Sequence, residues 1–257
     1  MNLHNFVELC MCPAPLGNEY AAKQLIRSML PNGLEISEDV AGSAIVRKPG
    51  EKPGLTFFAS LSQPVVLVTG KKADGAWELQ PLGTGKTLEP MNGWKVMDSG
   101  GAQAKLEVKD GELRLTEDKG VQIGSLLTRQ PDWTQDALSV SCAGIEDRVG
   151  CWLLTELLRE MPDVKAEITC IFLAQEQHCT KVAELAMNET DAAVAIRLAS
   201  AKVNDINLTG APVNAGGGPV LKLRERYVST DGRLMDLERM ACREAGVPFQ
   251  YEVLELD

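Results

Sequence analysis

Two segments decide how the rest of the chain is interpreted. They are Gly144-Ile145-Glu146-Asp147-Arg148-Val149-Gly150 and Leu173-Ala174-Gln175-Glu176-Gln177-His178-Cys179. One helical pattern and one strand pattern lie between them. Together they place two carboxylates, Glu146 and Glu176, at the ends of core elements of an α/β domain. Because open α/β sheets bind their ligands at such ends, these two segments form the candidate site.

Strands and helices alternate after this opening segment. Apolar residues at spacings of three and four predict a helix that ends before Pro162. Further on, the pattern predicts strands over 168–173, 191–198, 220–223 and 251–256, and helices over 180–187 and 234–245, the last one ended by Gly246. This alternation predicts an α/β fold with a mostly parallel, mixed sheet flanked by helices.

The N-terminal residues contribute further helices and strands to this α/β domain, whereas the residues in the middle of the chain have a different pattern. A helix over 18–29 with Asn18 as N-cap, strands over 34–38 and 43–47, and a buried strand over 55–61 are predicted. From 65 to 140 only short β-like pieces occur, with a hairpin signal at Asp110-Gly111. We therefore expect residues 1–63 and 141–257 to form the α/β domain, and residues 64–140 an inserted, small, all-β, barrel-like domain.

Composition excludes several classes of function. The 257 residues carry a formal net charge of −10, without the basic runs that follow phosphates, so no nucleic-acid binding is expected. No apolar stretch approaches the ~18 residues of a membrane span, and no signal peptide is recognisable. The seven cysteines, without a Cys-x-x-Cys pair, indicate reduced thiols and a cytoplasmic protein.

Each candidate residue has two interpretations. Glu176 is either a general base or a solvated carboxylate at a strand end. Glu146 either bridges metal ions or is an acidic residue that the macrodipole favours in a first helical turn. His178 and Cys179 could contribute to a metal site, although neighbouring residues at a helix start do not face one point.

Short motifs follow one another in a recognisable order. They are Cys12-Pro13-Ala14-Pro15-Leu16-Gly17-Asn18-Glu19, Asp39-Val40-Ala41-Gly42-Ser43, Asp74-Gly75, Pro81-Leu82-Gly83, Glu146-Asp147-Arg148-Val149-Gly150, Gln175-Glu176-Gln177, Gly216-Gly217-Gly218-Pro219 and Ala245-Gly246-Val247-Pro248-Phe249-Gln250. This series resembles that of the glutamyl and deblocking aminopeptidases, the TET-type metallo-aminopeptidases that are also labelled endoglucanase-M-like. The resemblance runs almost from end to end.

Members of that family hold two metal ions in a cleft, and a glutamate base activates the bridging water. The resemblance assigns the base position to Glu176 and the bridging aspartate position to Glu146. The other matching ligand positions carry residues that are poor metal ligands: Ser60, Ser62, Gln177 and Arg197. The family's final Gly-Gly-Thr-Asp-Ala segment and its last histidine ligand would lie beyond Asp257.

Arg197 is the most informative substitution. A guanidinium cannot lose its proton, and it would repel a divalent cation. We therefore expect Arg197 to take the place of a metal and to pair with Glu146 or Glu176.

The expected function is that of a peptidase-like protein without aminopeptidase activity and without a cofactor. It would bind a peptide or serve in assembly, as a homo-oligomer or together with an active paralogue. The alternative is an active metallo-aminopeptidase with Glu176 as base and two divalent ions (zinc or cobalt), in a site rebuilt from Glu146, His178 and Cys179.

Overall fold

The computed structural model describes residues 3–83, 88–179, 181–201, 203, 213–225 and 228–254. The chain divides into two compact units, Met1–Ala199 and Ser200–Asp257. In the described part of the chain, no helix has both the length and the apolar character needed to cross a bilayer.

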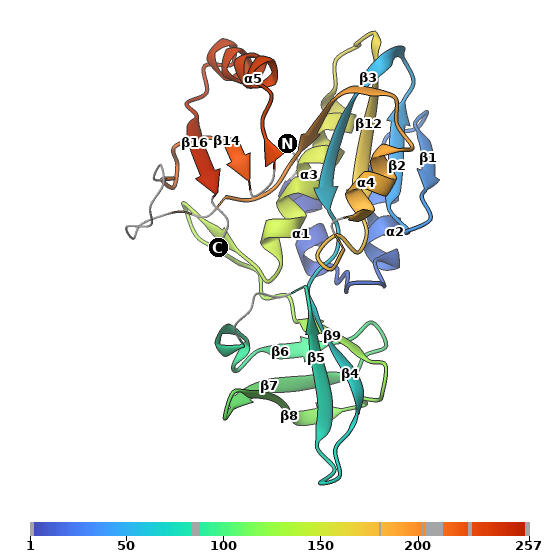
Figure 1. Cartoon of the computed structure of the whole chain (residues 1–257), viewed down its shortest axis with the longest axis vertical. Coiled ribbons are helices and arrows are strands. Elements are labelled where there is room, and N and C mark those ends of the chain that lie inside the picture. The colour runs from blue at the N-terminus through green and yellow to red at the C-terminus, as the bar shows by residue number, and fades with distance from the viewer. Residues whose placement is uncertain are drawn as a thin grey trace. The chain divides into compact units, whose positions relative to one another are not determined.

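A five-stranded mixed sheet forms the centre of the first unit (Figure 1). Its strands are β1 (Glu35–Glu38), β2 (Ala44–Lys48), β3 (Glu51–Ser60), β12 (Ala166–Leu173) and β13 (Ala192–Arg197), in the order β1-β2-β12-β3-β13. β3 runs parallel to both β12 and β13, whereas β2 is antiparallel to β1 and β12. The predicted α/β class with a mixed sheet is confirmed.

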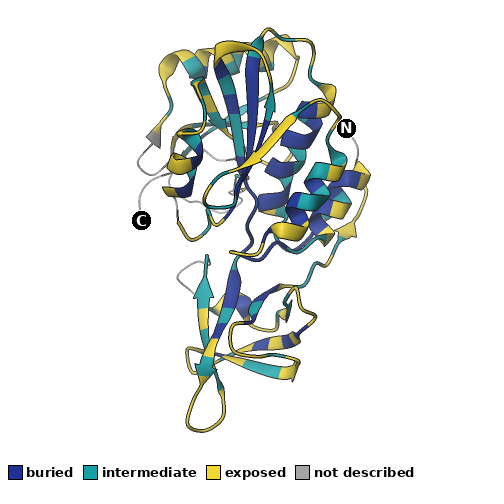
Figure 2. Ribbon diagram, turned by 90° about the vertical axis from the view of Figure 1, so that its right-hand side faces the viewer, coloured by how far each residue is buried: buried dark blue, intermediate teal, exposed yellow. Residues whose placement is uncertain are grey.

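Helices cover both faces of this sheet, so β12 is buried along almost its whole length (Figure 2). Its residues Ile168, Cys170 and Phe172 pack in one cluster with α1 (Leu3–Met11), α2 (Tyr20–Met29) and α3 (Ile145–Glu160). The alternate residues Ile171 and Leu173 pack in another cluster with α4 (Lys181–Met187). The continuous apolar run of β12 follows from this burial on two sides.

A second, six-stranded sheet has the order β5-β4-β9-β6-β7-β8. It consists of β4 (Val65–Lys71), β5 (Trp77–Leu82), β6 (Lys95–Met97), β7 (Gln103–Lys109), β8 (Glu112–Lys119) and β9 (Leu126–Arg129), with the 3₁₀ turn η1 (Glu89–Met91). Because the edge strands β5 and β8 approach each other, the sheet is nearly closed, like a barrel. The limits 64–140 of an inserted domain stay a prediction. A short pair, β10 (Thr134–Gln135) and β11 (Val140–Ser141), leads to α3.

Of two local features predicted from the sequence, the hairpin turn at Asp110-Gly111 is confirmed and the helix cap at Asn18 is not. Asp110 and Gly111 have φ angles of 53° and 76°, so the hairpin turn between β7 and β8 is confirmed. The predicted N-cap Asn18 is wrong, because Glu19 occupies that position of α2 without a side-chain cap. Asn18 instead donates its amide Nδ2 to Ser99 Oγ at 2.8 Å, since a tertiary partner competes with the local cap.

The described residues of the second unit form a three-stranded sheet in the order β15-β14-β16 and the helix α5. Its elements are β14 (Val220–Glu225), β15 (Val228–Ser229), α5 (Gly232–Glu244) and β16 (Gln250–Leu254). Gly246 has a φ of 64° just past α5 and ends it as predicted. Thr180 and residues 255–256, which belong to a predicted helix and a predicted strand, lie outside the described residues.

The side chain of Arg148, from α3, forms hydrogen bonds in the core with the backbone at the ends of α1 and β3. Its side chain is fully buried. Nε donates to Leu9 O at 3.0 Å and Nη2 to Cys12 O at 3.2 Å, at the C-terminal end of α1. Nη1 donates to Leu61 O at 2.6 Å, directly after β3. A cation at a helix C-terminus also suits the macrodipole.

Replacing Arg148 with methionine is expected to lower the free energy of unfolding by about 3–5 kcal/mol, because three carbonyl oxygens each lose a charged donor and two of these hydrogen bonds are buried. The matched control is Arg129→Met. Arg129 pairs with Asp132 and lies over the Trp94 ring at the surface, contacts that contribute about 1 kcal/mol or less each. Urea denaturation measures both variants; equal midpoints would refute the structural role of Arg148.

Candidate functional site

The loop 174–179 after β12 carries the candidate base, and its backbone is held by buried side chains. Gln175 N donates to Glu19 Oε1 at 3.0 Å and to Ser62 Oγ at 2.5 Å. Glu19 is buried, and its Oε1 also accepts from the Ser62 hydroxyl at 2.6 Å and from Gly17 N at 3.0 Å. The Gln175 φ angle of 57° lies in the left-handed region, a conformation that these hydrogen bonds maintain.

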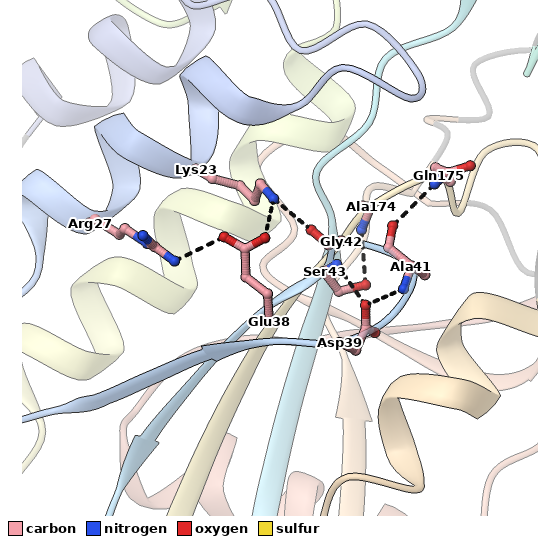
Figure 3. A network of polar contacts seen from close by, with 9 residues as sticks. All are labelled: Lys23, Arg27, Glu38, Asp39, Ala41, Gly42, Ser43, Ala174 and Gln175. Atoms are coloured by element: carbon pink, nitrogen blue, oxygen red, sulfur yellow. Dashed lines mark hydrogen bonds and ion pairs between the residues drawn. The ribbon is translucent and has the colours of Figure 1, made fainter.

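A second network braces the same loop from the turn at residues 39–43 (Figure 3). Gln175 Nε2 donates to Ala41 O at 3.1 Å, and Ala174 N donates to Ser43 Oγ at 3.2 Å. Within the turn, Asp39 Oδ1 accepts from Ala41 N and Ser43 N at 2.9 and 2.8 Å. The loop therefore rests on a turn whose own backbone is fixed.

Lys23 connects this turn to α2. Its Nζ donates to Gly42 O at 3.0 Å and to Glu38 Oε2 at 2.7 Å, and Arg27 Nη2 contacts Glu38 Oε1 at 2.9 Å (Figure 3). The three charged side chains form one network between α2 and β1, so the position of the loop depends on the packing of that helix.

Glu176 forms an ion pair with Arg197. Arg197 Nη2 donates to Glu176 Oε1 at 2.9 Å, and the Glu176 side chain is only 11% exposed. The guanidinium comes from the C-terminal end of β13, and the carboxylate comes from the loop after β12. Of the two pairings expected from the sequence, the structure contains the one with Glu176.

Asp147 is the buried carboxylate of the site. Its Oδ1 accepts from Gln177 Nε2 at 2.6 Å, whereas Oδ2 is buried without a hydrogen-bond partner among the described residues. Burial, followed by the nearby charge of Glu146, raises the Asp147 pKa to about 7, against the opposing effects of Arg148 and the Gln177 hydrogen bond.

Glu146 is exposed, although the sequence analysis placed it in the site and passed over Asp147. The difference lies in helical geometry. Asp147 shares the buried face of α3 with Cys151, Leu154 and Leu158, which follow it at intervals of four, seven and eleven residues. The helical spacing was the sequence signal that could have identified Asp147.

The two serines at substituted ligand positions play different parts. The Ser62 hydroxyl is used in the Glu19 network described above. Ser60 is buried, and its Oγ has no hydrogen-bond partner in the described part of the chain. Its carbonyl accepts from Cys151 Sγ at 3.1 Å.

These residues do not fit a pair of divalent ions. Arg197 occupies one oxygen of the base carboxylate, and Gln177 presents its amide NH₂ to Asp147. His178 and Cys179 are exposed in the turn and do not complete a ligand set. Among the residues that the structure describes, no group of three or more His, Cys, Asp and Glu side chains is arranged to hold a metal.

Comparisons with known proteins identify relatives of this chain. A curated protein of Acetivibrio thermocellus, provisionally described as an aminopeptidase, is 24% identical over 93% of this chain and 78% of its own length. A TET aminopeptidase from a marine sediment Thaumarchaeota archaeon has a TM-score of 0.88 and 16% identity, over 98% of this chain and 81% of its own.

The TET1 peptidase of Pyrococcus horikoshii, which can assemble into a tetrahedron or a large octahedral shell, has a TM-score of 0.82 and 17% identity, over 99% of this chain and 85% of its own. At these identities the two solved structures establish the shared fold. The M42 glutamyl aminopeptidase family matches residues 107–256, more than half of the sequence. The chain therefore belongs to the M42 glutamyl aminopeptidase family.

Proposed function

We propose that this chain is a metal-free member of the M42 family that does not hydrolyse peptides and that acts by binding peptides or by assembly. The observation that carries the proposal is the ion pair between Arg197 Nη2 and Glu176 Oε1 at 2.9 Å. Glu176 stands at the position of the family's base, and the guanidinium occupies the oxygen through which that carboxylate would act.

The positive charge of Arg197 also opposes the binding of a divalent metal ion. A divalent ion ~4 Å from a fixed positive charge is repelled by about 8 kcal/mol at an effective dielectric of ~20, and by about 2 kcal/mol in bulk water. Since Arg197 is 38% exposed, the value for this site lies between these limits. The neutral Gln177 and the hydroxyls of Ser60 and Ser62 supply no compensating negative charge.

The proposal also includes assembly with other subunits and a cytoplasmic location. The Pyrococcus TET1 peptidase can assemble into a tetrahedron or a large octahedral shell, so self-association, or co-assembly with an active paralogue, is the natural role for a fold without its catalytic metals. All seven cysteines are free, which suits a reducing, cytoplasmic location.

The rival reading is an active hydrolase that uses Glu176 with a site rebuilt from Glu146, His178 and Cys179. Elemental analysis after incubation with zinc, cobalt and manganese, followed by dialysis, separates the two. We expect no stoichiometric metal and no hydrolysis of aminoacyl chromogenic substrates. Two ions per chain retained through dialysis, together with turnover, would restore the hydrolase.

Arg197→Asp replaces the cation with a carboxylate, a group that can bind a divalent metal. We expect this variant to bind zinc at least about tenfold more tightly than the wild type, as measured by titration calorimetry. Arg129→Asp, which makes the same charge change in the six-stranded sheet, is the matched control and should leave zinc affinity unchanged.

The ion pair itself is tested with a double-mutant cycle of Arg197→Met and Glu176→Gln. Removing only Arg197 leaves a largely buried carboxylate without this cation, so we expect a loss of about 1–3 kcal/mol in unfolding free energy. The double variant should recover part of this loss, giving a coupling energy of about 1 kcal/mol or more. Additive effects of the two substitutions in urea denaturation would mean that the pair does not stabilise the site.

A further inference from the structure

The loop 174–179 has a third support, which comes from the six-stranded sheet. Gly83 directly follows β5, and both it and the loop belong to the first unit. A Cβ atom placed on Gly83 would lie 2.9 Å from Gln177 Cβ and 3.5 Å from both Gln177 O and Pro64 Cα. Because carbon atoms in contact lie about 3.5–4.0 Å apart, a methyl group at Gly83 would push Gln177 away. The backbone at Gly83 therefore packs closely against the loop.

Gln177 connects this contact to the buried carboxylate of the site. Its Nε2 donates to Asp147 Oδ1 at 2.6 Å, whereas Asp147 Oδ2 is buried without a hydrogen-bond partner among the described residues. Gln177 Cβ is the first atom of the side chain that carries this donor, so a displacement of Cβ moves the donor. Because an unpaired buried acceptor is costly, the position of Gln177 matters to the whole site.

Backbone conformation alone does not explain the glycine at this position. Gly83 has a φ angle of 71°, but Asp110 and Glu117 of the same sheet have φ angles of 53° and 54°, so residues with side chains occur there in left-handed conformations. At Gly75 and Gly111, which also have positive φ angles, an added Cβ would meet nothing within 4 Å. The close approach to Gln177 distinguishes Gly83 from these two turn glycines.

The six-stranded sheet is attached to the α/β part of the first unit by contacts outside the loop. Thr128 Oγ1, in β9, donates to the carbonyl of Pro64, which lies between β3 and β4, at 3.1 Å. Asn18 Nδ2, which precedes α2, donates to Ser99 Oγ, which lies between β6 and β7, at 2.8 Å. These contacts hold the sheet in place independently of the loop, so Gly83 can serve as a fixed support for it.

We propose that Gly83 is a positioning residue of the site, through which the six-stranded sheet holds Gln177 against Asp147. A shift of this sheet relative to the α/β sheet is transmitted to the loop of Glu176 by the same contact. The motif Pro81-Leu82-Gly83 thereby acquires a physical role. This inference goes beyond the proposed function, because it holds whether the loop binds a peptide or a metal.

Hydrogen–deuterium exchange, measured by mass spectrometry on the intact chain without metal or ligand, tests the coupling. Gly83→Ala is compared with Gly75→Ala, which adds the same methyl group to a left-handed backbone in open space. In Gly83→Ala, proteolytic fragments that cover residues 174–179 should exchange at least about fivefold faster than in the wild type, because the loop loses its support. In Gly75→Ala they should exchange at the wild-type rate. Equal exchange of this loop in the two variants would overturn the proposal.

A double variant tests whether Gln177 Cβ is the atom responsible. Gln177→Gly removes this atom and leaves the other neighbours of an added methyl group at 3.5 Å, an ordinary contact distance. In the wild-type background, Gly83→Ala should lower the urea midpoint at least about twice as far as Gly75→Ala does. In the Gln177→Gly background, Gly83→Ala should lower it no further than Gly75→Ala does in the wild type.

The double variant also decides the question if Gly83→Ala alone does not fold. We then expect Gly83→Ala with Gln177→Gly to fold, because the two Cβ atoms no longer meet. If the double variant is as unstable as Gly83→Ala, the contact with Gln177 is not the cause and the proposal fails. The metal and hydrolysis measurements on the wild type do not depend on this result, so the proposed function stands or falls separately.

Discussion

The fold of the first unit depends on one buried cation, the guanidinium of Arg148. It enters the core from the first turn of α3 and binds carbonyl oxygens at the end of α1 and after β3. Two of these carbonyls lie at the C-terminal end of α1 and one directly follows β3, where the regular hydrogen bonding of the helix and the strand ends; Leu9 O also accepts from Cys12 N at 3.3 Å. A methionine of similar length would fill the space but satisfy none of them, so the charge is retained in the core for its hydrogen-bonding geometry rather than for an ion pair.

The position of Arg148 also sets the chemistry of the site. With Arg148 turned into the core, its neighbour Asp147 lies on the buried face of α3, and Glu146 lies outside. Gly150, one turn further, lets α3 approach closely: an added Cβ would lie 2.8 Å from Leu198 O and from Ala59 Cβ. The helix therefore packs against β3 and against Leu198, the residue after β13, and brings a buried carboxyl group to the loop of Glu176.

The loop of Glu176 is held in place as firmly as the loops of active sites are. Among the described residues, however, no group of side chains is arranged to bind a metal. Buried Glu19 and the turn at residues 39–43 hold the loop at several backbone positions, a degree of organisation that functional loops commonly have. The side chains that converge there bind one another, because Arg197 forms an ion pair with Glu176 and Gln177 donates a hydrogen bond to Asp147. Such an arrangement suits recognition better than the polarisation of a bond.

The sequence by itself determined the class of the fold, the family, and the presence of a cation beside a glutamate, because apolar periodicity and the order of short motifs are properties of the chain alone. Only the tertiary structure decided which carboxylate is buried, which glutamate Arg197 pairs with, and that Ser62 serves Glu19. It also decided that β13, whose apolar run is typical of an interior strand, comes last in the order of the five-stranded sheet among the described residues. These outcomes depend on contacts between segments far apart in sequence, and local patterns carry no information about which partner a side chain meets.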